Sequence, residues 1–337
     1  MNDRVFKPSR RRFFAQASAA TAGLAVAAGA GRTAQAVNAT EGLAVYQLGP
    51  RIWIRLGEDV LTCYRAHPSQ KYPYFYPLVG PVSGLPLTVE TSDPYPHHRS
   101  LWLACDKVNG GNYWQEGYGQ GQIVSKGPTV ATPEANRVVI TDACAWKRPG
   151  APSPCQDSRI FEFSRSGRGY TLDVEIRWTA LENMTIPRTN HSLFSMRAAT
   201  DLAATGGGTL MSASGAAGAD ATFGKPAKWM AFFGKRRGDG PVEGIAIMDH
   251  PENMDGQTPW FTRDYGFASP TPLYFREKAF MLPKGETVIL RYRVAAFTGD
   301  PQAAGLDDLY KNWLATSERP QPVTPSVDQS PAASRGG

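Results

Sequence analysis

Two adjacent histidines, His97 and His98, are the first residues of this chain that could do chemistry. Pro94 and Pro96 come just before them, and two prolines stiffen the backbone and remove hydrogen-bond donors, so a rigid loop presents the pair. Adjacent side chains on a strand point to opposite faces, so we expect one histidine to face a cavity. Since histidine titrates near neutral pH, we assign His98 to acid-base catalysis and His97 to substrate binding. The alternative is that both side chains only stabilise the loop.

A further histidine, His250, ends an apolar strand-like run and directly follows Asp249. Acid-base catalysis on a sugar needs two groups that reach the same substrate, and burial can tune a carboxylate for this task. We expect His98 and His250 to face one mouth, with Asp249 and Glu116 as further catalytic candidates. Glu116 is preferred among the remaining carboxylates because it lies beside Trp114.

The segment from Asp106 to Trp114 has the residue types of a sugar site, since it offers a carboxylate, two amides and two aromatic rings. An aromatic face stacks on the C–H face of a pyranose, and the polar groups bond to its hydroxyls. We expect Trp114 or Trp260 to stack, and Arg99 and Arg263 to bind a carboxylate or hydroxyl. The alternative is a turn with two core aromatics. The predicted substrate-binding residues are His97, Arg99, Asp106, Asn109, Trp114, Asn253, Trp260 and Arg263.

A metal centre is the competing hypothesis for the same histidines. If His98, His191 and His250 converge, their number suits zinc, copper or iron. No chelating pair such as H-x-H or H-E-x-x-H enforces that convergence. We therefore predict no resident cofactor, and a divalent metal held by these three histidines stays as the alternative.

The four cysteines are interpreted through the compartment, because an oxidising compartment permits disulfides. Cys144 and Cys155 flank a turn-rich segment that could bring them together, so we expect a disulfide between them. Cys63 and Cys105 lie in apolar strand-like runs and are expected to be buried thiols. No C-x-x-C motif supports a redox site or a cysteine zinc site.

Strands must position these residues. Between Tyr170 and Trp178 apolar and polar residues alternate with a period of two, which is typical of a half-buried antiparallel strand. Only 301–316 shows the apolar spacing of a helix. The sequence predicts an all-β fold, a large antiparallel two-sheet β-sandwich with one C-terminal helix. Similar runs predict strands at 51–56, 60–64, 137–146, 159–165, 191–199, 209–212, 229–233, 243–248 and 287–297.

The chain divides into a leader, one domain and a tail. No linker-like stretch interrupts 37–316, which we interpret as a single domain. Residues 317–337 carry several prolines among small polar residues and are expected to be a disordered tail. Residues 1–36 are a separate N-terminal segment.

This N-terminal segment resembles a twin-arginine signal peptide. Arg10, Arg11 and Arg12 precede two phenylalanines, a mildly apolar Ala- and Gly-rich run and an Ala-x-Ala ending at Ala36. We expect cleavage after Ala36, the twin-arginine export machinery as a partner, and a periplasmic or secreted mature protein. No later run approaches the about 20 apolar residues of a membrane span, so no transmembrane helix is expected in the mature chain.

The net charge of +6 does not indicate nucleic-acid binding. Residues 1–36 contribute +5 of it, so the rest of the chain is nearly neutral. Sequence-independent phosphate binding needs clustered positive charge. We therefore expect no nucleic-acid partner.

Several separated motifs resemble one bacterial family. They are 71–78 with Gly80 and Pro81, 96–102, Asn109-Gly110 with Trp114, Trp229, 244–253 and 260–266. In this order, over about residues 45–312, they are similar to the family labelled "methane oxygenase PmoA", a domain of unknown function. The resemblance implies a β-sandwich similar to galactose mutarotase-like sandwiches and a role in carbohydrate metabolism. Literal methane oxidation is not expected, because that enzyme's subunit is an integral membrane protein.

Together these features predict an exported carbohydrate-active enzyme, a hydrolase, lyase or epimerase that uses histidine and carboxylate groups on a sugar or glycan. One alternative is a non-catalytic glycan-binding module, which would keep the aromatic residues but tolerate the loss of His98 and His250. The other is a metal oxidase or oxygenase with histidine ligands, which bound metal would distinguish.

Overall fold

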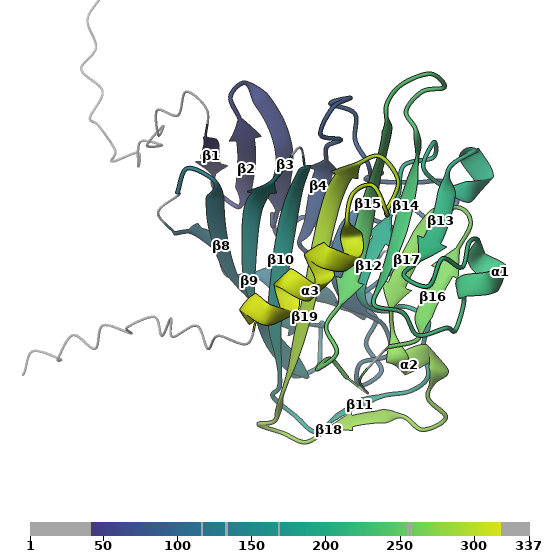
Figure 1. Cartoon of the computed structure of the whole chain (residues 1–337). Coiled ribbons are helices and arrows are strands. Elements are labelled where there is room, and N and C mark those ends of the chain that lie inside the picture. The colour runs from purple at the N-terminus through teal and green to yellow at the C-terminus, as the bar shows by residue number, and fades with distance from the viewer. Residues whose placement is uncertain are drawn as a thin grey trace, which may run out of the picture. The chain divides into compact units, whose positions relative to one another are not determined.

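Residues 42–115, 117–131, 134–167, 169–254, 256 and 258–317 are described by a computed structural model (Figure 1). The predicted signal peptide and residues 318–337 of the predicted tail lie outside this description, as does Glu116. The described residues form two large antiparallel sheets and one small one, with a helix near the C-terminal end. The predicted all-β, two-sheet sandwich with a C-terminal helix is therefore confirmed.

The first sheet contains eight strands in the order β1-β2-β3-β4-β5-β12-β17-β16. Its first five strands follow one another in the chain, whereas the last three come from much later in the sequence. The pairing of β5 with β12 therefore brings distant segments together. The strands are β1 (Leu43–Leu48), β2 (Arg51–Leu56), β3 (Asp59–Arg65), β4 (Tyr74–Leu78), β5 (Leu101–Cys105), β12 (Ser192–Arg197), β16 (Trp260–Arg263) and β17 (Phe267–Pro270).

The second sheet follows the order β13-β14-β15-β19-β10-β9-β8-β6, with β7 also paired to β8. The small third sheet pairs β11 (Met184–Ile186) with β18 (Phe280–Leu282). Three long strands, β8, β9 and β10, alternate in burial as their sequence alternates in polarity. The strands of the second sheet are β6 (Gln122–Ser125), β7 (Thr129–Val130), β8 (Arg137–Lys147), β9 (Cys155–Ser166), β10 (Gly169–Ala180), β13 (Thr209–Ser212), β14 (Trp229–Lys235), β15 (Val242–Asp249) and β19 (Thr287–Thr298).

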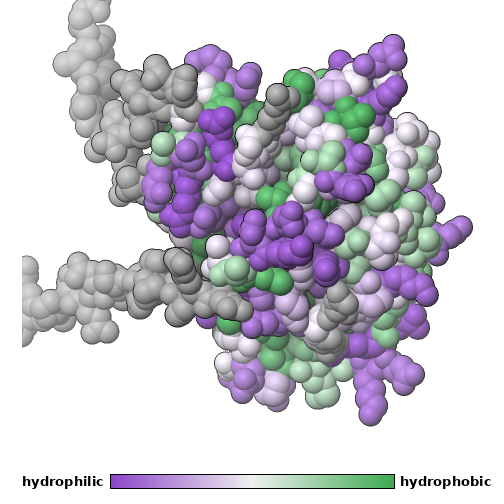
Figure 2. All heavy atoms as spheres, in the orientation of Figure 1, coloured by the Kyte–Doolittle hydropathy of each residue, from purple (hydrophilic) through white to green (hydrophobic). Residues whose placement is uncertain are grey.

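The helix α3 (Leu306–Ser317), drawn in yellow in Figure 1, packs on the outer face of the second sheet. It begins later than predicted because Gly305, with a φ of 63°, ends a preceding turn in the left-handed region. Trp313 and Tyr310 join side chains of β14, β15 and β19 in this contact. Hydrophilic residues surround the helix, and the hydrophobic areas visible on this side are small and separated (Figure 2).

Four short helical turns complete the described structure, and none was expected from the sequence. They are α1 (Ala219–Thr222), α2 (Pro272–Phe275) and two 3-10 turns, Tyr118–Gln120 and Ala204–Gly206. Across 42–317, excluding the six undescribed positions, no helix is both long and apolar enough to cross a membrane.

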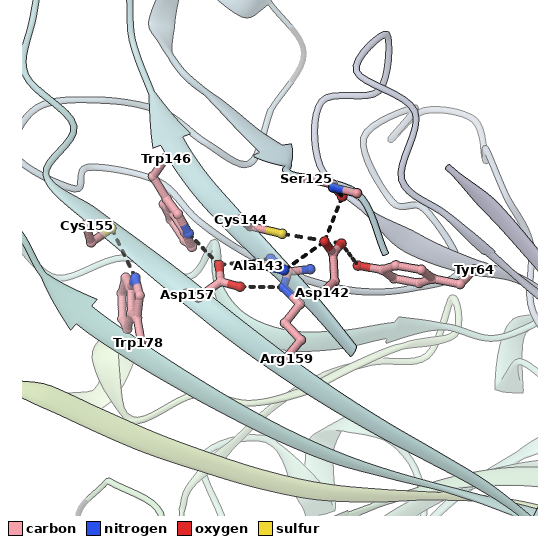
Figure 3. A network of polar contacts seen from close by, with 11 residues as sticks. Tyr64, Ser125, Asp142, Ala143, Cys144, Trp146, Cys155, Asp157, Arg159 and Trp178 are labelled. Carbon is pink, nitrogen blue, oxygen red and sulfur yellow. Dashed lines mark hydrogen bonds and ion pairs between the residues drawn. The ribbon is translucent and has the colours of Figure 1, made fainter. Parts of the chain in front are cut away.

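The main core lies between the inner faces of the two large sheets. A polar network is buried with it (Figure 3). The hydroxyl of Tyr64 on β3 donates to Oδ2 of Asp142 on β8 at 2.7 Å, so this bond joins the two sheets. Nearby, Nε of Arg159 lies 2.6 Å from Oδ1 of Asp157, and Nε1 of Trp146 donates to the other oxygen of that carboxylate. The arginine and aspartate side chains are almost fully buried, so each charge is satisfied by the other.

The predicted Cys144–Cys155 disulfide is wrong, because all four cysteines are free and buried. The turn between them does fold back, as the connection of the β8–β9 pair. However, the register places Cys144 opposite Asp157, two residues beyond Cys155. Residues offset in this way lie about 7–8 Å apart, beyond the usual Cα separation of a disulfide, about 4.4–6.8 Å. Cys155 instead accepts a hydrogen bond from Nε1 of Trp178 at 3.1 Å.

Candidate functional site

The outer face of the first sheet is built from alternate residues of β5, β12 and β17. Trp102 pairs with Ser195, and Arg197 pairs with Phe267, across adjacent strands. Phe194, next to Ser195, points into the sandwich, where it stacks on a tyrosine of β19 with ring centroids 4.7 Å apart. Neighbouring residues of a strand point to opposite faces. The side chains that point away from the second sheet are therefore those of Trp102, Ser195, Arg197 and Phe267.

Histidine and aromatic side chains from loops pack onto this face. The ring of His98 lies 4.8 Å from that of Phe267 and 4.7 Å from that of His97, and His97 lies 5.7 Å from His191. Trp114, from the loop after β5, contacts both His191 and Trp102. These contacts join segments that are far apart in the sequence. We call this group the outer-face cluster: Tyr95, His97, His98, Trp102, Trp114, His191, Arg197, Tyr265 and Phe267.

His98 is only 4% exposed within this cluster. Its pKa is lowered to about 2, mainly by burial and in smaller part by the charges of His97, Arg197 and His191. The imidazole is therefore neutral at physiological pH. It can donate or accept a hydrogen bond, but it carries no proton that it could deliver as an imidazolium.

Several buried polar atoms on this face have no hydrogen-bond partner among the described residues. Such atoms are rare in native proteins, because each costs about 1–3 kcal/mol when it is left unpaired. Most of them are N–H donors, so the face is suited to a ligand rich in oxygen atoms. The atoms are Nδ1 of His98, Nε1 of Trp102, Nε1 of Trp114, Oγ of Ser195, and Nε and Nη1 of Arg197.

His191 and Asp106 form a histidine–carboxylate pair at the edge of the cluster. Nδ1 of His191 lies 3.3 Å from Oδ2 of Asp106, and the backbone N–H of Asp106 donates to the carbonyl of His191 at 2.9 Å. The hydroxyl of Thr189 donates to the other carboxylate oxygen. The His191 side chain is 24% exposed, so this imidazole reaches solvent while its aspartate is held in place.

A cavity of about 490 Å³ adjoins this pair, because Asp106 forms part of its wall. Asn109 shapes the wall rather than reaching into the space with a free amide. Its Oδ1 accepts from the N–H of Thr185 at 2.7 Å, and its Nδ2 donates to the carbonyl of Asn183. The cavity is lined by Asp106, Lys107, Asn109, Gly110, Gly111, Asn112, Gln115, Thr185 and Pro187.

The structure brings together most of the residues predicted around the first histidine pair. His97, His98, Trp114 and His191 lie in the outer-face cluster, and Asp106 joins it to the cavity.

The two predicted arginines lie on the margins. Arg263 lies 4.1 Å from the ring of Phe261, and that ring contacts Phe267 of the cluster. Arg99 donates to Oγ1 of Thr91 in an exposed position.

The predicted stacking role of two tryptophans is wrong for this structure. Trp114 and Trp260 are both fully buried, so neither offers a ring face to a sugar. Trp260 instead donates from Nε1 to the carbonyl of Ala227 at 2.9 Å. In the outer-face cluster, Tyr95 is 36% exposed, whereas Trp102 and Trp114 are buried.

The second predicted half of the site lies elsewhere. The ring of His250 lies 5.2 Å from that of Trp313 on α3, at the outer side of the second sheet. Asp249 pairs with Tyr292, the tyrosine that stacks on Phe194 inside the sandwich, so its side chain points inward, where Nδ2 of Asn253 donates to its Oδ1 at 2.7 Å. The expectation that His98 and His250 share a mouth is therefore wrong, because His98 packs on the outer face of the first sheet and His250 packs against α3 on the outer side of the second.

The proposed three-histidine metal set is not assembled for the same reason. His98 and His191 lie in the cluster, whereas His250 lies beneath α3. Among the residues for which the structure gives coordinates, no group of three or more His, Cys, Asp or Glu side chains could hold a metal ion.

The sequence interpretation missed Arg197, Tyr265 and Trp102. Arg197 lies over the ring of Tyr265 at 4.3 Å, and Trp102 stacks on His98. One signal was present in the sequence: Ser195 and Arg197 are polar residues at alternate positions of the otherwise apolar run 193–199. Two polar side chains on one face of a buried strand indicate a functional face.

Comparison with known proteins identifies a family but no activity. The model of the family of unknown function DUF6807 matches residues 51–311. This finding corrects the resemblance to the "methane oxygenase PmoA" family, which the match does not support. No curated protein matches the chain.

Two solved structures show distant likeness. One is the GH36 alpha-galactosidase AgaB from Geobacillus stearothermophilus, 12% identical, with a TM-score of 0.37. The other is a doubly substituted AgaA alpha-galactosidase from the same organism in complex with stachyose, 11% identical, with a TM-score of 0.35. Each match covers 77% of this chain and 40% of the enzyme, so the chain spans well under half of either enzyme's length.

Proposed function

Because the chain belongs to DUF6807, a family of unknown function, we propose its activity from the site itself. We propose that the protein is an exported carbohydrate-active enzyme. His191 and Asp106 carry out acid-base chemistry on a sugar bound in the adjoining cavity. The reaction belongs to the hydrolase, lyase or epimerase classes, which all move a proton at a sugar carbon or oxygen.

One observation carries this proposal. Asp106 lines the cavity, and its carboxylate lies 3.3 Å from Nδ1 of His191. With the Nδ1 proton directed at the carboxylate, the Nε2 atom is left to exchange a proton with a substrate. The cavity volume falls within the range of about 300–1,000 Å³ that is usual for small-molecule sites.

The surrounding groups favour a sugar over an apolar ligand. Lys107, Asn112 and Gln115, which carry ammonium and amide groups, line the cavity. Sugar hydroxyls can accept from such donors. His98, held neutral, acts here as a hydrogen-bonding group rather than as the acid.

Export rests on the leader, whose residues resemble a twin-arginine signal. We propose a periplasmic or secreted location for the mature protein. Replacing Arg10, Arg11 and Arg12 together by lysine should leave the unprocessed chain in the cytoplasm, which fractionation and mass determination would detect. Normal processing of that variant would contradict the route.

The catalytic proposal is tested by screening neutral and acidic mono- and oligosaccharides for binding and turnover. His191→Gln and Asp106→Asn should lower kcat by about 10²–10⁴-fold, the usual contribution of a general acid or base, while sugar binding changes little. His67→Gln is the matched control, because His67 is exposed and lies outside the site. Binding without turnover would indicate a glycan-binding module instead, and a protein that binds no sugar would refute the proposal.

A further inference from the structure

Arg197 carries a buried positive charge that the described protein does not balance. The residue is 8% exposed, and its Nε and Nη1 atoms have no hydrogen-bond partner among the residues with coordinates. Its guanidinium lies 4.3 Å from the centre of the Tyr265 ring, which supplies an aromatic face but no anion. Leaving an ion buried without a partner costs several kcal/mol.

The other buried arginines do have carboxylate partners. Nε of Arg159 lies 2.6 Å from Asp157, and Nη1 of Arg236 lies 3.0 Å from Asp201. Glu243 also lies 3.8 Å from Nε of Arg236. Arg197 therefore differs from Arg159 and Arg236 in its missing counter-charge, although all three are similarly buried.

The neighbours of Arg197 cannot supply a negative charge. Burial raises the pKa of Tyr265, so its hydroxyl stays neutral, and His98 is neutral as well. Asp264, next to Tyr265 in the chain, is committed elsewhere, since its Oδ1 accepts from the N–H of Ala219 at 2.8 Å. The ring of Tyr265 also contacts Tyr95, which is 36% exposed, so the cluster reaches the surface.

We infer that the sugar of the proposed function is an acidic one and that Arg197 binds its carboxylate. This inference rests on the proposed function and adds the substrate class to it. A single guanidinium among neutral groups balances the one negative charge of a uronate, and its N–H groups match carboxylate oxygens. Trp102 stacks on His98, and Trp114 contacts both Trp102 and His191, so the contacts of this cluster run from Arg197 to the proposed acid-base pair.

The test measures equilibrium binding of D-galacturonate and D-glucuronate against D-galactose and D-glucose, with acetate as a carboxylate without a sugar. The wild-type protein should bind the uronates at least about tenfold more tightly than the neutral sugars. Arg197→Met should abolish that preference, because the affinity for the uronates should fall to about that for the neutral sugars. Arg197→Lys, which keeps the charge, should retain a weaker preference. The matched control is Arg177→Met, because Arg177 is an exposed arginine of β10.

Thermal unfolding provides a second measurement. Without ligand, Arg197→Met should unfold at or above the wild-type temperature, because it removes an unbalanced buried charge. A purely structural arginine would give a clear decrease. If that variant does not fold, a uronate preference that is weaker in Arg197→Lys than in the wild type, with Arg177→Met unchanged, would still support the role of the guanidinium, and an undiminished preference would overturn it.

The outcomes separate the two proposals. Three results would overturn the inference and leave the proposed function in place. They are equal binding of uronates and neutral sugars, a uronate preference that survives in Arg197→Met, and acetate binding as tight as that of the uronates. Binding of no sugar at all would overturn the proposed function itself.

Discussion

The imidazole of His98 stacks on the ring of Phe267, with centroids 4.8 Å apart and planes inclined by 30°. Phe267 begins β17, and His98 lies in the loop before β5, so the contact fastens this loop to the sheet. The aromatic surroundings desolvate His98 and lower its pKa to about 2. The residue that the sequence indicates as an acid is thus held as a neutral group.

The first prediction concerns His98→Phe. The unfolded chain has a histidine pKa of about 6.5, so it takes up this proton before the folded protein does. The contribution of His98 to stability is therefore present above about pH 6.5 and is lost as the pH falls toward 2. Between pH 8 and pH 5 this amounts to about 2 kcal/mol, which the variant should not lose. Urea unfolding at these two pH values measures the difference.

His67→Phe is the control for this prediction, because His67 is exposed. Its stability should follow the wild-type pH profile. If His98→Phe also follows that profile, His98 is not held neutral by burial.

The second prediction has the opposite sign and concerns Asp249→Asn. Burial raises the pKa of Asp249 to about 7, compared with 3.8 in the unfolded chain. Its contribution is fully present below pH 3.8 and is lost as the pH rises toward 7. Asparagine keeps an oxygen that can accept from Asn253, so relative to wild type the variant should gain about 2–4 kcal/mol between pH 4 and pH 8.

Denaturant titrations at pH 4, 6 and 8 measure this change, with Asp59→Asn as an exposed control. A constant difference between Asp249→Asn and wild type over this range would show that Asp249 titrates normally in the folded protein.

The third prediction concerns the buried Asp157–Arg159 pair (Figure 3). Asp157→Asn should lower the free energy of unfolding by about 3–5 kcal/mol, because it leaves the buried arginine without its counter-charge. The matched surface pair is Arg137–Glu162, whose nitrogen–oxygen distance of 2.7 Å is similar. Glu162→Gln should cost only about 0–1 kcal/mol. Equal losses in the two variants, measured by urea unfolding, would refute the role of burial.

The fourth prediction concerns the thiols. Burial raises the pKa of Cys63 to about 11 and raises those of Cys105, Cys144 and Cys155 as well. The native protein should therefore react slowly with a thiol reagent such as dithionitrobenzoate, because the thiolate is the reactive form. In denaturant without reductant all four cysteines should react. Only two reactive thiols would mean that a disulfide forms after all.

The sequence by itself determined the fold class. In β8, β9 and β10 polarity alternates because one face meets the core and the other meets solvent, and the structure alternates in burial accordingly. The strand β5, which the sequence indicated only as an apolar strand-like run containing Cys105, shows no alternation because all five of its residues are buried. Its outer face is covered by the histidines and aromatic rings of the cluster, so alternation vanishes where the candidate site lies.

Part of the candidate site was also contained in the sequence. His97, His98, Asp106 and Trp114 flank β5, and a single strand keeps residues close in sequence close in space. The partners of this segment were not predictable in the same way. Arg197 reaches the cluster only because β5 pairs with β12 and β12 pairs with β17.

His250 demonstrates the limit most clearly. The sequence places both His98 and His250 near strand ends, but it does not state which strands pair. The structure assigns β5 to the first sheet and β15 to the second, where α3 covers the outer face. Polarity alternation reflects the local contrast between core and solvent, whereas sheet membership depends on packing between segments far apart in the chain. The sequence therefore determined which elements form, and only the tertiary structure decided which side chains meet.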